Sequence, residues 1–263
     1  MPKLAVTGKG GVGKTTLAAL LAGIYAQAGH PVIAIDADPA ASLGSALGVP
    51  EAMLSQLTPV AEMYDLIYER TGAKPGTTGG FFTINPRVDD IPDRFSVLHN
   101  GVRLLQLGSV SAGGSGCICP ESALLKALVT YVILYRNEVM ILDMDAGIEN
   151  LGRATAGAVD AFMIVVEPGR RSVSTARTIH RLAADIGVTR CYAVGNKVRD
   201  QADRDFVRNS LTDLPVIGFL SLNQHAVEAD KQGLSVFEAA PDLAVEARRI
   251  AAAFDEAMAA PQS

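Results

Sequence analysis

Short apolar runs alternate with longer segments of helical period along the whole chain. The apolar runs, which predict strands, are 4–6, 32–35, 103–107, 139–143, 162–166, 192–194 and 215–220. The segments between them that predict helices are 14–28, 121–136, 172–187, 201–211 and 242–259. Continuous apolar strands that alternate with helices are typical of a parallel sheet buried on both faces. The pattern predicts an α/β protein with a doubly wound, mostly parallel sheet and helices on both faces.

One stretch interrupts this alternation. Residues 71–95 are rich in Gly, Pro and Asp, and the strand series resumes after them. We therefore expect an exposed insertion inside a single domain over 1–263, not a domain boundary. The last helical segment, 242–259, has an apolar face made mostly of Ala, which predicts a packing helix and not a membrane anchor.

Composition narrows the functional classes. The chain of 263 residues has 23 basic and 28 acidic residues and a net charge of −5. It therefore lacks the overall excess of basic residues that is typical of proteins that bind nucleic acid. It has no apolar run of about 20 residues, as a membrane span requires, and its three cysteines cannot form a disulfide framework. We expect a cytoplasmic protein that binds neither nucleic acid nor membranes.

The first loop fits two nucleotide-binding motifs. Residues 8–15, GKGGVGKT, match G-x-G-x-x-G, and Asp36 ends the second strand where a dinucleotide enzyme keeps its ribose carboxylate. The same residues match G-x-x-x-x-G-K-[ST], which is more specific because it adds Lys14 and Thr15. A pyrophosphate needs neither side chain, whereas a Mg²⁺-bound triphosphate uses the lysine on its β- and γ-phosphates and the hydroxyl on its metal. The motif therefore favours a triphosphate, and the residues expected to hold it are Gly10, Gly11, Val12, Gly13, Lys14, Thr15 and Thr16.

Lys9 adds a second lysine to this loop. With it, KGGVGKTT (9–16) resembles the deviant Walker A ATPases, which include MinD, ParA, the nitrogenase iron protein and the CooC-type nickel-insertion ATPases. The resemblance implies a nucleotide-dependent homodimer in which Lys9 reaches the partner's phosphates. It also implies catalytic roles for Lys9 and Lys14, and for Asp38 as the carboxylate that orients the attacking water.

Polar residues after three other strands complete the expected site. Asp36 follows the second strand and is expected to support the Mg²⁺ shell, while Asp143 in ILDMDAG is the expected Walker B ligand of Mg²⁺. Gly147 lets a backbone N–H approach the γ-phosphate, and Asp145 either couples this segment to the metal or is a surface residue. Asn196 and Lys197 resemble the family's base-reading position.

The base read there is predicted to be adenine. An Asn amide both donates to and accepts from an adenine edge, and a guanine-specific N-K-x-D motif would have Asp where this chain has Arg199. ATP and ADP are therefore the expected nucleotides.

Cys117 and Cys119 are spaced C-x-C in the loop GGSGCICPES (113–122). Pro120 predicts a helix start, which places Cys119 at or beside an N-cap, where the helix dipole favours the metal-binding thiolate. A soft divalent ion such as Ni²⁺ or Zn²⁺ takes four ligands, and one C-x-C pair supplies two sulfurs. Two protomers would therefore complete the site. A redox dithiol or inert thiols are the alternatives, and Cys191 is expected to be a buried small hydrophobe.

Taken together, the motifs resemble the CooC family over nearly the whole chain. They are the deviant Walker A loop, DADP (36–39), C-x-C before a helix, DMDAGIENLGR (143–153), EPGRRS (167–172) and GNK (195–197). The resemblance implies ATP hydrolysis coupled to nickel insertion into a client, carbon monoxide dehydrogenase or, as for a close relative, acetyl-CoA synthase. A ParA/MinD-type positioning switch without a metal role and an iron–sulfur ATPase reductase remain the alternatives.

Overall fold

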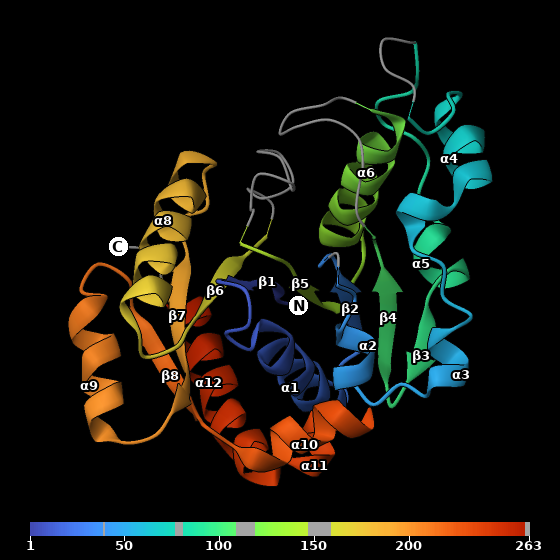
Figure 1. The fold of residues 1–263 in the computed structure, drawn as a ribbon. Coiled ribbons are helices and arrows are strands. Elements are labelled where there is room, and N and C mark those ends of the chain that lie inside the picture. Colours follow the sequence, from blue (N-terminus) through green and yellow to red (C-terminus); the bar gives the residue numbers. More distant parts are fainter. Residues whose placement is uncertain (39, 77–80, 109–118, 147–158, 261–263) are drawn as a thin grey trace.

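One mixed sheet organises the protein (Figure 1). The computed structural model describes residues 1–38, 40–76, 81–108, 119–146 and 159–260. Within them the strand order is β3-β4-β2-β5-β1-β6-β7-β8, and every pairing is parallel except that of the edge strand β3 with β4. The strands are β1 Lys3–Gly8, β2 Val32–Asp36, β3 Val97–His99, β4 Val102–Gln106, β5 Val139–Asp143, β6 Ala161–Val166, β7 Cys191–Val198 and β8 Val216–Ser221. The predicted fold class is confirmed.

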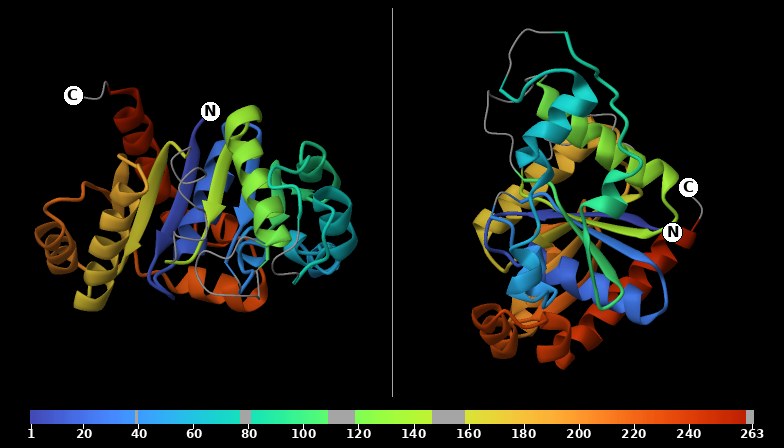
Figure 2. Two further views of the ribbon diagram at one scale, coloured as in Figure 1. Left: turned by 90° about the horizontal axis from the view of Figure 1, so that it is seen from above. Right: turned by 90° about the vertical axis from the view of Figure 1, so that its right-hand side faces the viewer.

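Helices cover both faces of the sheet (Figure 2). Residues of α6, α8 and α9 share one buried cluster with one face of the strands, and residues of α1, α11 and α12 share a second cluster with the other face. The helical segments are α1 Lys14–Gln27, α2 Leu43–Ala46, α3 Glu51–Leu54, η1 Val60–Glu62, α4 Tyr64–Thr71, α5 Ile91–Arg94, α6 Pro120–Tyr135, α8 Arg170–Asp185, α9 Gln201–Ser210, α10 Gln224–Gln232, α11 Val236–Ala239 and α12 Pro241–Ala259.

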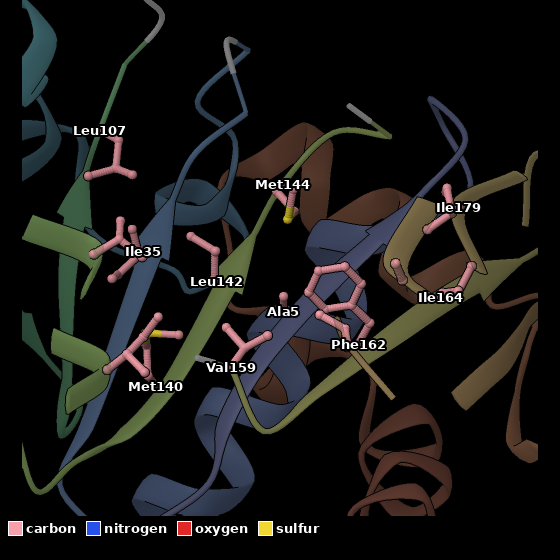
Figure 3. Close-up of a cluster of buried hydrophobic side chains, with 14 of the residues drawn as sticks. Ala5, Ile35, Leu107, Met140, Leu142, Met144, Val159, Phe162, Ile164 and Ile179 are labelled. Carbon is pink, nitrogen blue, oxygen red and sulfur yellow. The ribbon is translucent and has the colours of Figure 1, made fainter. Parts of the chain in front are cut away.

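The continuous apolar runs are explained by this double burial. In β6, Phe162 and Ile164 point into the first cluster, whereas Met163 and Val165 belong to the second. Figure 3 shows the first cluster, in which Phe162 lies beside Ala5 of the neighbouring strand β1. Because side chains alternate along a strand, burial on both faces requires every position to be apolar.

The last helix packs on the sheet as expected. Leu243, Ile250 and Phe254 of α12 are buried in the second cluster. Among the residues that the structure describes, no helix is long and apolar enough to cross a membrane.

The stretch 71–95 is not uniformly exposed, which corrects the expectation for an insertion. Phe81 and Ile84 lie on the surface, but Val88 and Ile91 are buried in the first cluster together with the inner residues of α6. Two apolar side chains in a polar stretch are enough to anchor it, because burying each one stabilises the fold by about 1.5–3 kcal/mol.

Candidate nucleotide site

The loop between β1 and α1 has the backbone shape of a phosphate cradle. Gly11 and Gly13 have φ of 77° and 93°, in the left-handed region that favours glycine. A Cβ at Gly13, the N-cap of α1, would collide with the amide of Asn196, whereas Gly10 and Gly11 face open space. Val12 is fully buried and anchors the loop. The N–H of Val12 donates to the carbonyl of Lys9 over 3.3 Å. The N-terminus of α1, whose first turn contains Thr15 and Thr16, faces this loop and favours an anion.

Lys14 and Asp38 form an ion pair at this cradle. The side chain of Lys14 is 7% exposed, and its Nζ lies 3.7 Å from Oδ2 of Asp38. The other carboxylate oxygen of Asp38 accepts a hydrogen bond of 2.9 Å from the N–H of Ala40. The predicted phosphate-binding lysine and the predicted water-orienting carboxylate are therefore neighbours in space.

Asp36 and Asp143 are direct neighbours in the sheet, because they are register partners at the ends of β2 and β5. The hydroxyl of Thr15 donates to Oδ2 of Asp143 over 2.6 Å and lies 3.2 Å from Oγ of Ser42. The second oxygen of Asp143 is buried and has no hydrogen-bond partner among the described residues. A hydroxyl and an unpaired carboxylate oxygen side by side are the hard oxygen ligands that Mg²⁺ prefers.

Both carboxylates have raised pKa values. Burial raises the pKa of Asp143 to about 7, and the negative charge of Asp36 adds to this, while the hydrogen bond from Thr15 lowers it. Burial also raises the pKa of Asp36 to about 6, against the hydrogen bonds that its carboxylate accepts from the backbone of Leu43 and Asp38. Two buried, adjacent carboxylates favour a bound cation, so Thr15 and Asp143 fit a Mg²⁺ ion with Asp36 in support.

Asn196 and Lys197 hold the phosphate loop from the side of β7. The amide nitrogen of Asn196 donates to the carbonyl of Val12 over 2.7 Å, and its oxygen accepts from the backbone N–H of Lys197 over 2.8 Å. Lys197 donates through Nζ to the carbonyl of Gly11. One amide N–H of Asn196 is left for a base. Base reading therefore stays a prediction, and the structure adds a contact with the loop that the sequence did not indicate.

Lys9 pairs within its own chain. Its Nζ lies 3.4 Å from Oε1 of Glu167, and the second oxygen of Glu167 lies 4.0 Å from Nζ of Lys197. The contact of Lys9 with a partner's phosphates remains a prediction, since one chain cannot display it.

Comparison with known proteins identifies the family. A family model for the CobQ/CobB/MinD/ParA nucleotide binding domain matches residues 3–236. The chain belongs to this family. It is homologous to the carbon monoxide dehydrogenase accessory protein CooC of Rhodospirillum rubrum, with 44% identity over 97% of this chain and 96% of that protein. An uncharacterized ATP-binding protein of Methanocaldococcus jannaschii is 42% identical over 88% of this chain and 89% of its own length.

Solved structures of the same family share the fold. A chain of the MinC:MinD cell division protein complex of Aquifex aeolicus superposes with a TM-score of 0.71 at 18% identity, over 100% of this chain and 98% of that one. MinD of Pyrococcus horikoshii complexed with Mg-ADP gives 0.63 at 17% identity, over 98% of each chain. At these identities the likeness shows the fold alone.

Of the two cysteines predicted to bind metal in this CooC homologue, the structure describes one. Cys119 is the N-cap of α6 with Pro120 after it, as predicted, but it is buried and its Sγ donates to Oγ of Ser122 over 3.3 Å. Cys117 and Gly147 lie outside the described residues. Within those that are described, no three His, Cys, Asp or Glu side chains are grouped to hold a metal. Cys191 is buried, which raises the pKa of its thiol to about 11 and fits the expected small hydrophobe.

Two residues at the site were not predicted from the sequence. Ser42 lies against the Thr15 hydroxyl, and no motif pointed to it. Glu167 directly follows the apolar run 162–166, so the rule that selected Asp36 and Asp143 at strand ends would have found it.

Proposed function

We propose that this protein is an ATP-hydrolysing metallochaperone that dimerises with nucleotide and inserts nickel into carbon monoxide dehydrogenase. The observation that carries the proposal is the 44% identity to the carbon monoxide dehydrogenase accessory protein CooC over 97% of the chain. The nucleotide site supports the ATPase half of the proposal, and the C-x-C spacing of Cys117 and Cys119 supports the metal half.

In the ATPase half, each side chain has a distinct task. The ammonium of Lys14, almost enclosed beside the loop, binds the β- and γ-phosphates and compensates the charge that develops during transfer. Thr15 and Asp143 would hold Mg²⁺, which supplies charge neutralisation of the phosphates when bound. Asp38, next to Lys14, orients the water that attacks the γ-phosphate, and the products are ADP and phosphate.

In the metal half, Ni²⁺ is the cargo. We expect Cys117 and Cys119 of two protomers to bind it through four thiolates, a set that also fits Zn²⁺. Cys119 lies at the N-cap of α6, two residues after Cys117 in the sequence. In the described chain its Sγ is buried against Ser122, so metal binding requires this thiol to turn outward. If ATP changes the contact between subunits, metal affinity changes with it, and by linkage the metal changes ATP affinity by the same factor.

The test is activation of nickel-free carbon monoxide dehydrogenase by the purified protein with Ni²⁺, Mg²⁺ and ATP. We expect activation by the wild type and by Cys191→Ser, a matched control at the third cysteine, and none by Cys119→Ser or Lys14→Ala. Activation that needs neither ATP nor Cys119 would contradict the proposal.

The two alternative functions give different results in an anaerobic metal titration followed by absorbance. Charge transfer from thiolate to nickel supports the metallochaperone. Absence of metal binding indicates a positioning switch, and broad iron–sulfur bands indicate a reductase.

A further inference from the structure

Three charged side chains form a row along the ends of neighbouring strands. Lys9 follows β1, Glu167 follows β6 and Lys197 lies near the end of β7. These strands are adjacent in the sheet, with Gly8 opposite Val165 and Val166 opposite Gly195. One carboxylate therefore lies between two ammonium groups, at 3.4 Å from Lys9 and 4.0 Å from Lys197.

The backbone of Glu167 is held in place by a hydrogen bond. Its N–H donates over 3.1 Å to Oγ of Ser172, which is buried in the first turn of α8. Its side chain is 31% exposed, and its two oxygens pair with the ammonium groups of Lys9 and Lys197. The carboxylate is thus positioned before any ligand arrives.

The two lysines differ in what else holds them. Lys197 also donates to the carbonyl of Gly11 and has φ of 56°, an uncommon backbone conformation for a lysine. For Lys9, whose side chain is 38% exposed, Glu167 is the partner that the described part of the chain provides. Removing the charge of Glu167 should therefore free Lys9 more than Lys197.

We propose that Glu167 is a positioning residue that holds Lys9 against its own subunit while no nucleotide is bound. This inference rests on the proposed function, in which Lys9 binds the phosphates of a partner's nucleotide. Lys9 cannot pair with Glu167 and reach across the dimer at once, so the intrachain pair competes with the dimer contact. Glu167 thereby raises the protein concentration at which nucleotide produces a dimer.

The size of the effect follows from exposure. Ion pairs between partly exposed side chains change an equilibrium by about two- to fivefold. A triphosphate carries more charge than one carboxylate, so it displaces Glu167 from Lys9. The pair of Lys9 and Glu167 therefore raises the protein concentration needed for the dimer but does not prevent the dimer from forming.

The first experiment measures acetylation of Lys9 by a water-soluble acylating reagent in the nucleotide-free protein, by mass spectrometry. We expect Glu167→Gln to raise the rate at Lys9 about two- to fivefold, and Glu167→Asp, which keeps the charge, to raise it less. Glu228→Gln is the matched control, because Glu228 pairs with Lys231 at 3.3 Å on α10. It should raise acetylation at Lys231 and leave Lys9 unchanged.

The second experiment measures the dimer dissociation constant by sedimentation with Mg²⁺ and a non-hydrolysable ATP analogue. In about 50 mM NaCl we expect the dimer dissociation constant of Glu167→Gln to be about two- to fivefold lower than that of the wild type. In about 500 mM NaCl the two constants should be closer to each other, because salt screens exposed ion pairs. Unchanged acetylation of Lys9, or a weaker dimer, in Glu167→Gln overturns the role of Glu167. A wild type that stays monomeric with the analogue instead overturns the dimer in the proposed function, and the acetylation result then still decides whether Glu167 holds Lys9.

Discussion

Lys14 is expected to be indispensable for turnover and dispensable for folding. It is the first residue of α1 and lies outside the two hydrophobic clusters, and its ammonium contacts only Asp38 among the ion pairs of the described residues. Lys14→Ala should lower the ATP turnover number about 100-fold or more, since it removes charge compensation in the transition state. Steady-state hydrolysis and a thermal melt test both halves of this statement. Turnover near the wild-type rate would refute the phosphate-loop assignment.

Asp38→Asn should separate binding from hydrolysis. The amide can still accept the hydrogen bond that Ala40 gives to the carboxylate, so the loop should keep its shape. It cannot orient water as a carboxylate does, and it no longer opposes phosphate binding at Lys14. We expect unchanged or tighter ATP affinity with slower turnover, measured by equilibrium binding and by single-turnover hydrolysis. A loss of affinity as large as that in Lys14→Ala would show that Asp38 acts in binding.

Asn196→Asp should weaken nucleotide binding for two reasons that one experiment can separate. A carboxylate cannot donate to the carbonyl of Val12 as the amide does, and it cannot donate to adenine. We expect a loss of about 1–3 kcal/mol in ATP binding, since a buried acceptor loses its donor, and a weaker preference for ATP over GTP in competition binding. Tripolyphosphate, which has no base, should also bind less tightly; if only the nucleotides lose affinity, the loop contact is unimportant and the residue acts on the base.

Asp36 and Asp143 could be predicted from the sequence because the end of a strand is a local feature. Asp36 and Asp143 each follow an apolar run, and parallel pairing brings such ends together. The contacts of Ser42 with Thr15 and of Glu167 with Lys9 join segments that are far apart in the chain. They depend on sheet order and register, which the sequence does not show directly.

At the level of elements, prediction succeeded where burial on both faces leaves an unbroken apolar run. All seven predicted strands and all five predicted helices are present, with boundaries that shift by a few residues. The antiparallel edge strand β3 was missed because it has three residues, of which Leu98 is exposed and the other two are half-buried, and shows no long apolar run. The helices α2, α3, α5 and α11 have four residues each, too short for a helical period to appear.

Phe254→Ala tests whether α12 is a packing element independent of the site. The ring is fully buried and meets the ring of Tyr192 edge to face at 5.9 Å. The substitution should lower the free energy of unfolding by about 3–5 kcal/mol, the usual result of deleting a buried Phe, while ATP affinity of the folded protein stays unchanged. Val245→Ala, at a surface position of the same helix, should change stability by less than about 0.5 kcal/mol. Denaturant unfolding measures both, and equal effects would place α12 outside the core.

The whole molecule has an uneven charge distribution that its net charge of −5 conceals. The surface of α8 carries four exposed arginines, and the last residue of that helix is its one acidic residue. They are Arg170, Arg171, Arg177 and Arg181. A sum over the chain therefore says little about individual surfaces, and the absence of nucleic-acid binding stays a prediction.

The prediction that belongs to the assembly is a metal ion shared by two chains. Two sulfurs from each chain leave a tetrahedral or square-planar ion half-coordinated, so binding should saturate at about one metal per two protomers. Cys117→Ser and Cys119→Ser should each weaken binding strongly, because hydroxyls are poor ligands for soft metals. Cys191→Ser should not, since Cys191 stands outside the C-x-C pair, in β7.

The buried state of Cys119 sharpens this expectation. Its Sγ must leave the hydrogen bond to Ser122 and lose its proton before it can bind metal, so metal uptake should release protons and be slower than diffusion. Because the metal binds the dimer, it should shift the protein towards dimer by mass action. Sedimentation with and without Ni²⁺ or Zn²⁺, beside a stoichiometric titration in weak buffer with a pH indicator, measures all three effects. An endpoint of one metal per monomer with no change in mass would refute the shared site and leave the two cysteines as a chelate within one chain.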